Sequence, residues 1–204
     1  MKTLDDFKNP FDAILEFESN LCDYTGAPYC VTTDCCTHAI EMVMRLLEVK
    51  NTAFPCRTYL SVLMTMHKIG IQYTLKDEHW TGQYKFDKTN VWDSARAFSN
   101  NMYTPGTIQC VSFGMTKPLA IGLGGCVLTD DRNLYDNLSR MRYDGRDIFK
   151  HSPWVIQKKF SVGYHYYMRP EECVIGINML ANQQFTYQKE EFYNYPDCRN
   201  IQIV

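Results

Sequence analysis

Short strand-like runs alternate with helix-like runs along most of this 204-residue chain, and this alternation constrains the fold more than any other feature. Apolar and β-branched runs predict strands over residues 29–33, 53–55, 71–75, 90–93, 107–113 and 125–129. The spacing of apolar residues predicts helices over residues 10–25, 37–49, 59–69, 131–142 and 170–188. This order predicts an α/β fold with a mainly parallel sheet flanked by helices, in which ligands bind at the carboxyl ends of strands.

The connection between the strands at 71–75 and 90–93 does not fit the regular pattern. A parallel crossover through a helix needs a dozen or more residues. Residues 76–89 barely reach that length, and they include the sequence His79-Trp80-Thr81-Gly82. We therefore expect at most one tight connection in this stretch.

Charge and hydropathy exclude several classes of function. A formal net charge of -2 gives no general basic field for binding nucleic acid. No apolar run approaches the ~20 residues needed to span a membrane, and the acidic first residues lack the apolar core of a signal peptide. We expect a cytoplasmic, single-domain protein over residues 1–204, with a short N-terminal segment (1–16) and a residual tail (189–204), that binds neither nucleic acid nor membrane.

The nine cysteines are an odd number without a secretory signal, which favours free thiols in a reducing compartment. Most of them are expected to act as small buried apolar groups. The candidate metal ligands are Cys22, Cys30, Cys35, Cys36 and His38. No second ligand pair follows at the spacing that structural zinc requires, so we expect no metal.

Three segments at strand ends combine residues that carry chemistry. Residues 34–39 join a strand to a helix, where free N–H groups form an anion site, although a plain N-cap role for Thr37 is favoured when this segment is taken alone. Asp93 ends an apolar strand, where it also suits a helix cap. Lys117 follows a buried strand and precedes the glycine-rich residues 122–125. A phosphate cradle, a strand-end carboxylate and a strand-end lysine are together what pyridoxal phosphate (PLP) needs.

With these segments in order, the sequence resembles the DegT/DnrJ/StrS sugar aminotransferases over most of its length. Asp93-Ser94-Ala95 is similar to the family's Asp-Ala-Ala, and the segment from Ser112 to Lys117 is similar to Ser-Phe-x-x-x-Lys. Cys36-Thr37-His38-Ala39 stands in the place of Gly-Thr-x-Ala. The segment from Pro55 to Tyr59 is similar to Pro-x-x-Thr-aromatic.

The resemblance implies a role for each matching residue. Lys117 would bind PLP covalently and then act as general base, while Asp93 would pair with the protonated ring nitrogen. Tyr59 would stack on the ring. The remaining expected cofactor-binding residues are those of the phosphate segments, namely Ser112, Cys36 and Thr37.

The sequence also departs from the family pattern. Arg96 replaces a glutamine next to the expected position of the cofactor's phenolic oxygen. His165, within Gly163-Tyr164-His165-Tyr166-Tyr167-Met168, replaces an asparagine that reaches the phosphate in the partner subunit. The crossover before Asp93 and most of the small C-terminal domain are missing relative to the family.

The resemblance therefore implies a reduced large domain of the PLP-dependent transferase fold, acting as a homodimer with a shared active site. It implies a PLP-dependent aminotransferase that transfers an amino group from an amino acid such as glutamate to a keto-sugar nucleotide. Lys117 argues against the family's dehydratase branch, in which histidine replaces the lysine. The departures motivate an alternative from another class, a non-catalytic PLP-binding or structural dimer, because function depends on the site and not on the fold.

Overall fold

The computed structural model describes residues 1–147, 153–185 and 195–203 of the chain. Within these residues the helices are α1 (Asp12–Thr25), α2 (Cys36–Leu46), α3 (Leu60–Lys68), α4 (Arg132–Met141) and α5 (Pro170–Ala181). The strands are β1 (Tyr29–Thr33), β2 (Asn51–Pro55), β3 (Gln72–Lys76), β4 (Tyr84–Lys85), β5 (Val91–Asp93), β6 (Ile108–Ser112) and β7 (Gly125–Thr129). Short 3-10 turns lie at Leu4–Asp6, Trp154–Ile156 and Cys198–Asn200.

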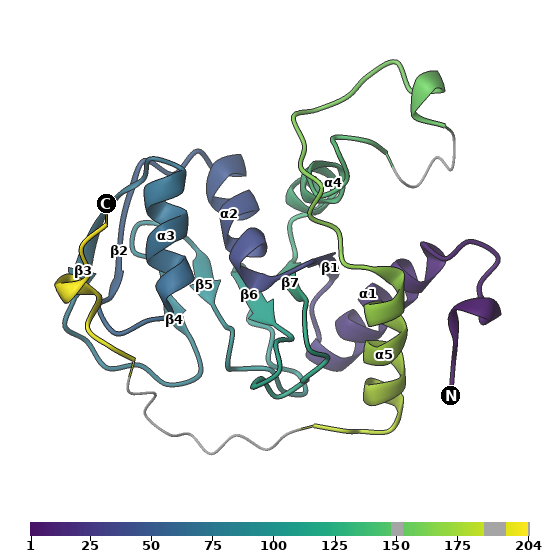
Figure 1. The fold of residues 1–204 in the computed structure, drawn as a ribbon, viewed down its shortest axis with the longest axis horizontal. Helices are drawn as coiled ribbons and strands as arrows, with labels where there is room; N and C mark the ends of the chain where they lie inside the picture. Colours follow the sequence, from purple (N-terminus) through teal and green to yellow (C-terminus); the bar gives the residue numbers. More distant parts are fainter. Residues whose placement is uncertain (148–152, 186–194, 204) are drawn as a thin grey trace.

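The strands form a five-stranded sheet in the order β1-β7-β6-β5-β4 and a separate β2-β3 pair (Figure 1). The α/β class is confirmed, but the sheet is mixed where a mainly parallel one was expected. β5–β6 and β2–β3 are parallel, whereas β1–β7, β6–β7 and β4–β5 are antiparallel. The link between β6 and β7, residues 113–124, contains no helix. A strand that returns without a crossover helix pairs antiparallel with its predecessor.

The short stretch before β5 forms the tight connection that its length predicted. Its strand β4 pairs antiparallel with β5, so that Tyr84 lies opposite Asp93 and Lys85 opposite Trp92. This pairing places the side chain of Tyr84 beside Asp93, at the carboxyl end of β5.

Most predicted element boundaries agree with the structure to within a few residues, and β1 and β7 match completely. Helix α1 begins at Asp12 instead of Pro10, because the turn before it is tighter than an α-helix: the Asp12 N–H donates to the Asn9 carbonyl at 2.8 Å and the Ala13 N–H to the Pro10 carbonyl at 3.2 Å. The Asn9 side chain accepts from the Phe11 N–H at 3.1 Å, as an N-cap does. It ends at Gly26, whose φ of 79° is left-handed. Helix α5 ends at Ala181; residue 188, its predicted end, and the beginning of the predicted tail lie outside the described residues.

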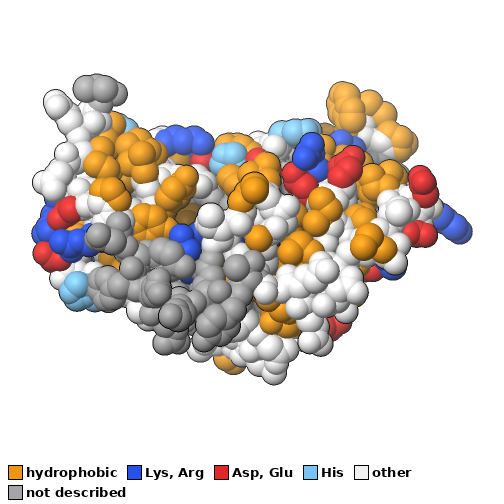
Figure 2. All heavy atoms as spheres, turned by 60° about the horizontal axis from the view of Figure 1, so that its bottom comes forward, with side chains coloured by type: hydrophobic (Ala, Val, Ile, Leu, Met, Phe, Trp, Pro, Cys, Tyr) orange, Lys and Arg blue, Asp and Glu red, His pale blue; other side chains and the backbone are white. Residues whose placement is uncertain are grey.

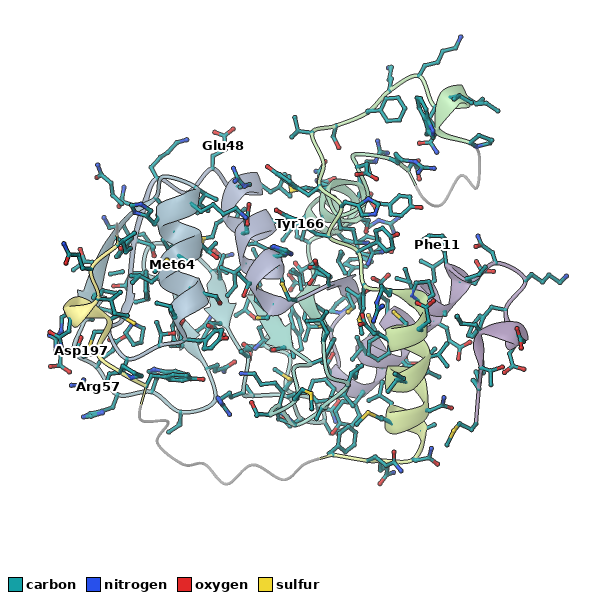
Figure 3. All side chains as sticks on the ribbon, viewed as in Figure 1. Phe11, Glu48, Arg57, Met64, Tyr166 and Asp197 are labelled. Carbon is teal, nitrogen blue, oxygen red and sulfur yellow. The ribbon has the colours of Figure 1, made fainter. Side chains whose placement is uncertain are left out.

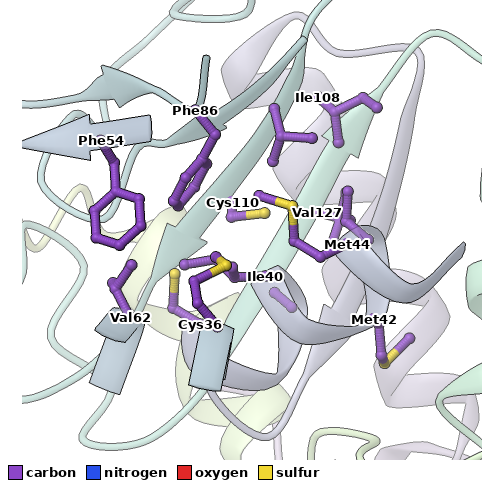
Figure 4. Packing of buried hydrophobic residues seen from close by; sticks show 14 of the residues in the cluster. Cys36, Ile40, Met42, Met44, Phe54, Val62, Phe86, Ile108, Cys110 and Val127 are labelled. Carbon is purple, nitrogen blue, oxygen red and sulfur yellow. The ribbon is translucent and has the colours of Figure 1, made fainter. Parts of the chain in front are cut away.

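Two apolar clusters cover the two faces of the sheet, because alternate residues of a strand point to opposite faces. On one face, Cys110 and Val127 pack with α2, α3 and α4 (Figure 4). On the other face, Val111 and Cys126 pack with α1 and α5. Seven of the nine free cysteines are buried, in agreement with their expected role as small apolar groups.

A buried ion pair ties α1 to the chain after α4. Arg142, fully buried, donates from Nη1 to Glu18 Oε1 on α1 and to the backbone oxygen of Thr32 at 2.8 Å. Glu18 also accepts from the Thr32 N–H at 2.7 Å. The ion pair therefore holds α1, β1 and the end of α4 together.

The segment around Trp154–Ile156 projects away from the body of the molecule in Figure 1. Basic and acidic side chains are mixed on the face shown in Figure 2, which has no continuous basic surface. None of the described helices is both long and apolar enough to cross a membrane.

Candidate active site

A cavity of about 410 Å³ opens where the carboxyl ends of β5 and β6 meet the N-terminus of α2. Because β5 and β6 are parallel, the residues that end them share one edge of the sheet. The cavity contains all of the expected site residues except His165. Its lining comprises Cys35, Cys36, Thr37, Ile40, Thr58, Tyr59, Ser61, Val62, Trp80, Asp93, Ala95, Arg96, Ser112, Gly114, Met115, Thr116, Lys117, Leu123, Gly124 and Tyr195.

Asp93 is the buried carboxylate of this cavity, with 6% of its surface exposed. Its Oδ2 accepts a hydrogen bond from the Tyr84 hydroxyl at 2.8 Å, and its Oδ1 accepts from the Ala95 N–H at 3.0 Å. Burial raises the pKa of Asp93, while these two donors and the positive charges of Lys117 and Arg96 oppose the rise. Each carboxylate oxygen thus keeps free acceptor capacity toward the cavity.

Lys117 is the partly buried amine of the cavity. It lies in a tight turn after β6, where its N–H donates to the Gly114 carbonyl at 2.9 Å. Burial lowers the pKa of Lys117, Arg96 lowers it further, and Asp93 opposes the change. A lysine with a lowered pKa is more often neutral, which is the form that attacks a carbonyl carbon.

The N-terminus of α2 forms a third wall. Thr37 in its first turn shares a hydrogen bond of 2.8 Å with Ser61. This wall approaches the sheet closely because Gly125 has no side chain: a Cβ there would lie 2.5 Å from the backbone nitrogen of Cys36. Ser112 lies at the adjoining end of β6. Free N–H groups and hydroxyls of this kind suit an anion.

The sequence did not reveal the aromatic wall of the cavity. Tyr195 accepts a hydrogen bond from Arg96 Nε at 3.2 Å, and its ring lies parallel to that of Trp80 with centroids 6.2 Å apart. Tyr59, expected to stack on the cofactor, is 60% exposed and contacts Tyr195 edge-on. These contacts join residues far apart in the sequence, so no local pattern predicts them.

The C-terminal residues reach this wall by docking beside β2. The Cys198 N–H donates to the Cys56 carbonyl at 2.9 Å. Figure 3 shows Arg57 and Asp197 on neighbouring segments, and the nearest charged atoms of this pair lie 3.8 Å apart. Arg199 pairs with Asp77 at 3.1 Å.

His165 lies outside the cavity lining. Its side chain is 69% exposed, and its Nδ1 lies 3.0 Å from Asp144 Oδ2. A role at the phosphate of the same chain therefore has no support, and the expectation for His165 concerns a partner subunit alone.

Of the residues considered as metal ligands, the structure brings together Cys35 and His38, with Asp34 as a third member. His38 Nδ1 lies 2.7 Å from Asp34 Oδ1. The hydrogen bonds with Asp34 and Cys35 raise the pKa of His38 to about 9, although burial opposes the rise. The raised pKa favours the protonated imidazole, and a ring nitrogen must lose its proton before it can bind a metal.

The sequence profile of the DegT/DnrJ/EryC1/StrS aminotransferase family matches residues 5–77 and 92–195. The chain belongs to this family. The interval between the two matched ranges contains the shortened connection with β4, which explains why the family pattern is interrupted there.

Relatives and solved structures agree with the family. A UDP-4-amino-4,6-dideoxy-N-acetyl-beta-L-altrosamine transaminase of Campylobacter jejuni is 31% identical over 91 residues, which are 44% of this chain and 23% of that enzyme. AtS13 from Actinomadura melliaura superposes with a TM-score of 0.68 at 16% identity, covering 83% of this chain and 60% of AtS13. PseC of Helicobacter pylori, an aminotransferase of pseudoaminic acid biosynthesis, superposes with a TM-score of 0.65 at 15% identity, covering 83% and 57%. The chain thus spans 57–60% of the length of these two solved proteins.

Proposed function

We propose that this chain binds PLP covalently through Lys117 and transfers an amino group from an amino acid such as glutamate to a keto-sugar nucleotide. The observation that carries the proposal is the gathering of Asp93, Lys117 and the N-terminus of α2 in one cavity. A sugar nucleotide as acceptor is supported by the UDP-sugar transaminase among the relatives.

The donor groups of the cavity fit PLP in kind. Asp93, with free acceptor capacity, suits a protonated ring nitrogen, and Lys117 suits an aldehyde carbon. The α2 N-terminus with Thr37 and Ser112 suits a phosphate. Bound PLP would supply an electron sink for the substrate's α-carbon. Lys117, once released from the cofactor, would move the proton at that carbon, and Asp93 would keep the ring nitrogen charged.

The experiment is a cofactor loading assay. Purified protein incubated with PLP and freed of excess cofactor should show the yellow absorption of an imine between PLP and a lysine. Borohydride should then fix one pyridoxyl group on the peptide that contains Lys117. Glutamate should then convert the cofactor to its amino form in the unreduced protein, and the matched variant Lys117→Arg should show neither result. Loading without any response to a panel of amino acids would establish the alternative, a binding protein without turnover. Absence of loading would refute the proposal.

We further propose a homodimer with a shared site. The projecting segment carries exposed apolar side chains, namely Trp154, Val155, Ile156, Phe160 and Val162. Exposed apolar groups gathered on one projecting arm are typical of an interaction surface. His165 lies at the base of this arm, near Tyr143 and Tyr167. The proposal places the partner's arm over the cavity, where His165 would meet the phosphate.

A further inference from the structure

Tyr84 lies directly opposite Asp93 in the β4–β5 pairing, next to a residue that lines the cavity. It is only 4% exposed. Its ring packs edge-on against Trp80, with centroids 4.9 Å apart, and against Phe86, with centroids 5.4 Å apart. The ring therefore has little freedom, and its hydroxyl points in one direction.

The Tyr84 hydroxyl lies between two polar groups. It is 2.8 Å from Asp93 Oδ2 and 2.7 Å from the hydroxyl of Thr58. A hydroxyl has a single proton to donate, and an ionised carboxylate only accepts. Tyr84 therefore donates to Asp93 and accepts from Thr58, which makes a directed chain from Thr58 through Tyr84 to Asp93.

We propose that Tyr84 is a positioning residue, which holds Asp93 ionised and oriented toward the ring nitrogen of the cofactor. This inference rests on the proposed PLP function. Charged groups gain more from a hydrogen bond than neutral ones, and a buried carboxylate without donors takes up a proton instead. A phenylalanine at position 84 would supply the same ring packing without the donor, so the hydroxyl is the part of Tyr84 that acts on Asp93.

The other groups that act on Asp93 come from every element around it. Lys117, after β6, and Arg96, after β5, favour the charged carboxylate. The thiols of Cys36 on α2 and Cys110 on β6 also interact with it, but burial holds their pKa values well above the usual range. These thiols stay neutral around neutral pH and place no negative charge beside the carboxylate. The hydrogen bonds to Asp93 come from the Tyr84 hydroxyl and the Ala95 N–H.

The test compares Tyr84→Phe and Thr58→Val with the control Tyr103→Phe. The Tyr103 hydroxyl also donates a hydrogen bond, to the Thr107 carbonyl at 2.9 Å, and Tyr103 does not line the cavity. Two measurements are made on the full chain. The ionisation of Asp93 is followed without cofactor by NMR of ¹³C-labelled aspartate, with Asp93→Asn for assignment. PLP affinity is then titrated between pH 5 and 9.

Tyr84→Phe should raise the pKa of the Asp93 carboxyl by about one unit, since loss of one donor to a charged group is worth roughly a factor of ten. The acid limb of PLP affinity should move to higher pH by the same amount. Thr58→Val should shift both measurements in the same direction by less, because Tyr84 keeps its proton. Tyr103→Phe should match the wild type.

The outcomes separate this inference from the proposed function. An Asp93 titration that is unchanged in Tyr84→Phe would overturn the positioning role, even if PLP binds. If Tyr84→Phe shifts the Asp93 titration but the wild type binds no PLP, the proposed function and the cofactor role of Tyr84 are overturned, while the effect of the Tyr84 hydroxyl on the ionisation of Asp93 stands. If Tyr84→Phe does not fold, as judged by circular dichroism, Thr58→Val decides, and an unshifted titration there overturns the inference.

Discussion

The imidazole of His38 lies face to face with the phenol ring of Tyr166, with centroids 3.7 Å apart and ring planes within 6° of each other. The Nδ1 atom of the same imidazole is hydrogen-bonded to Asp34 Oδ1 at the ring edge, while one face of the ring is covered by Tyr166. This arrangement joins the first turn of α2 to the segment that leads into α5.

His38 should make stability depend on pH. Its pKa of about 9 lies above the ordinary value of 6.5, so its contribution is fully present below pH 6.5 and is lost as pH rises through 9. His38→Phe, which keeps a ring beside Tyr166, should lower the free energy of unfolding by about 1–2 kcal/mol at pH 6 and by much less at pH 10. Urea denaturation at both pH values measures this. His165→Phe is the matched control, since its Asp144 pair is exposed. Equal losses at both pH values would contradict the assignment.

The ion pair between Arg142 and Glu18 should be the most sensitive polar contact of the core. Arg142→Leu leaves the Glu18 carboxylate buried without its cation and should cost about 3–5 kcal/mol of unfolding free energy. The double variant with Glu18→Leu should recover part of that loss, because no charge then remains buried. Chemical denaturation of both variants measures the difference, and an additive double variant would show that the two side chains are not coupled.

Arg96 should control the pH at which Lys117 reacts. Arg96→Gln, which restores the amide typical of the family, removes a positive charge that lowers the pKa of Lys117. The pKa of Lys117 should rise by about 0.5–1 unit. Borohydride capture of PLP at Lys117, followed from pH 6 to 10, should therefore require higher pH. Arg57→Gln is the control, since Arg57 is paired with Asp77 and does not line the cavity. A pH profile of PLP capture in Arg96→Gln that equals the wild type would contradict this prediction.

Tyr195 should shield Lys117 from solvent. Tyr195→Ala removes the ring that lies beside Trp80 and the hydroxyl that meets Arg96. Chemical labelling of Lys117 by trinitrobenzenesulfonate should become faster, with little change in unfolding free energy. Tyr103→Phe again serves as the control away from the cavity. Labelling at the wild-type rate would mean that the C-terminal residues do not restrict access.

His165 should act across the dimer axis. His165→Ala should weaken PLP binding and leave the dimer intact, whereas Ile156→Ser in the projecting arm should weaken the dimer itself. Light scattering and cofactor titration measure the two effects. A monomer with full PLP affinity, or a His165→Ala variant identical to wild type, would rule out the shared site.

The sequence determined the parts of this protein that depend on neighbouring residues. Apolar residues recur about every 3.6 positions in a half-buried helix and every second position in a half-buried strand. This spacing therefore predicted the individual strands and helices and the α/β class. Asp93 ends an apolar strand and Lys117 follows another, and the resemblance of their motifs to the family placed both in one site. The shortness of residues 76–89 likewise predicted a tight connection.

Tertiary structure alone decided the direction of strand pairing and which residues contact each site residue. β7 returns antiparallel to β6 because no helix connects them, and a periodic pattern carries no sign of direction. The β4–β5 pairing brings Tyr84 to Asp93, and the docking of residues 195–203 brings Tyr195 to the cavity from the far end of the chain. The pKa shifts of Asp93 and Lys117 depend on burial and on charges across the cavity. Such contacts form between residues remote in sequence, and only the folded chain sets their distances.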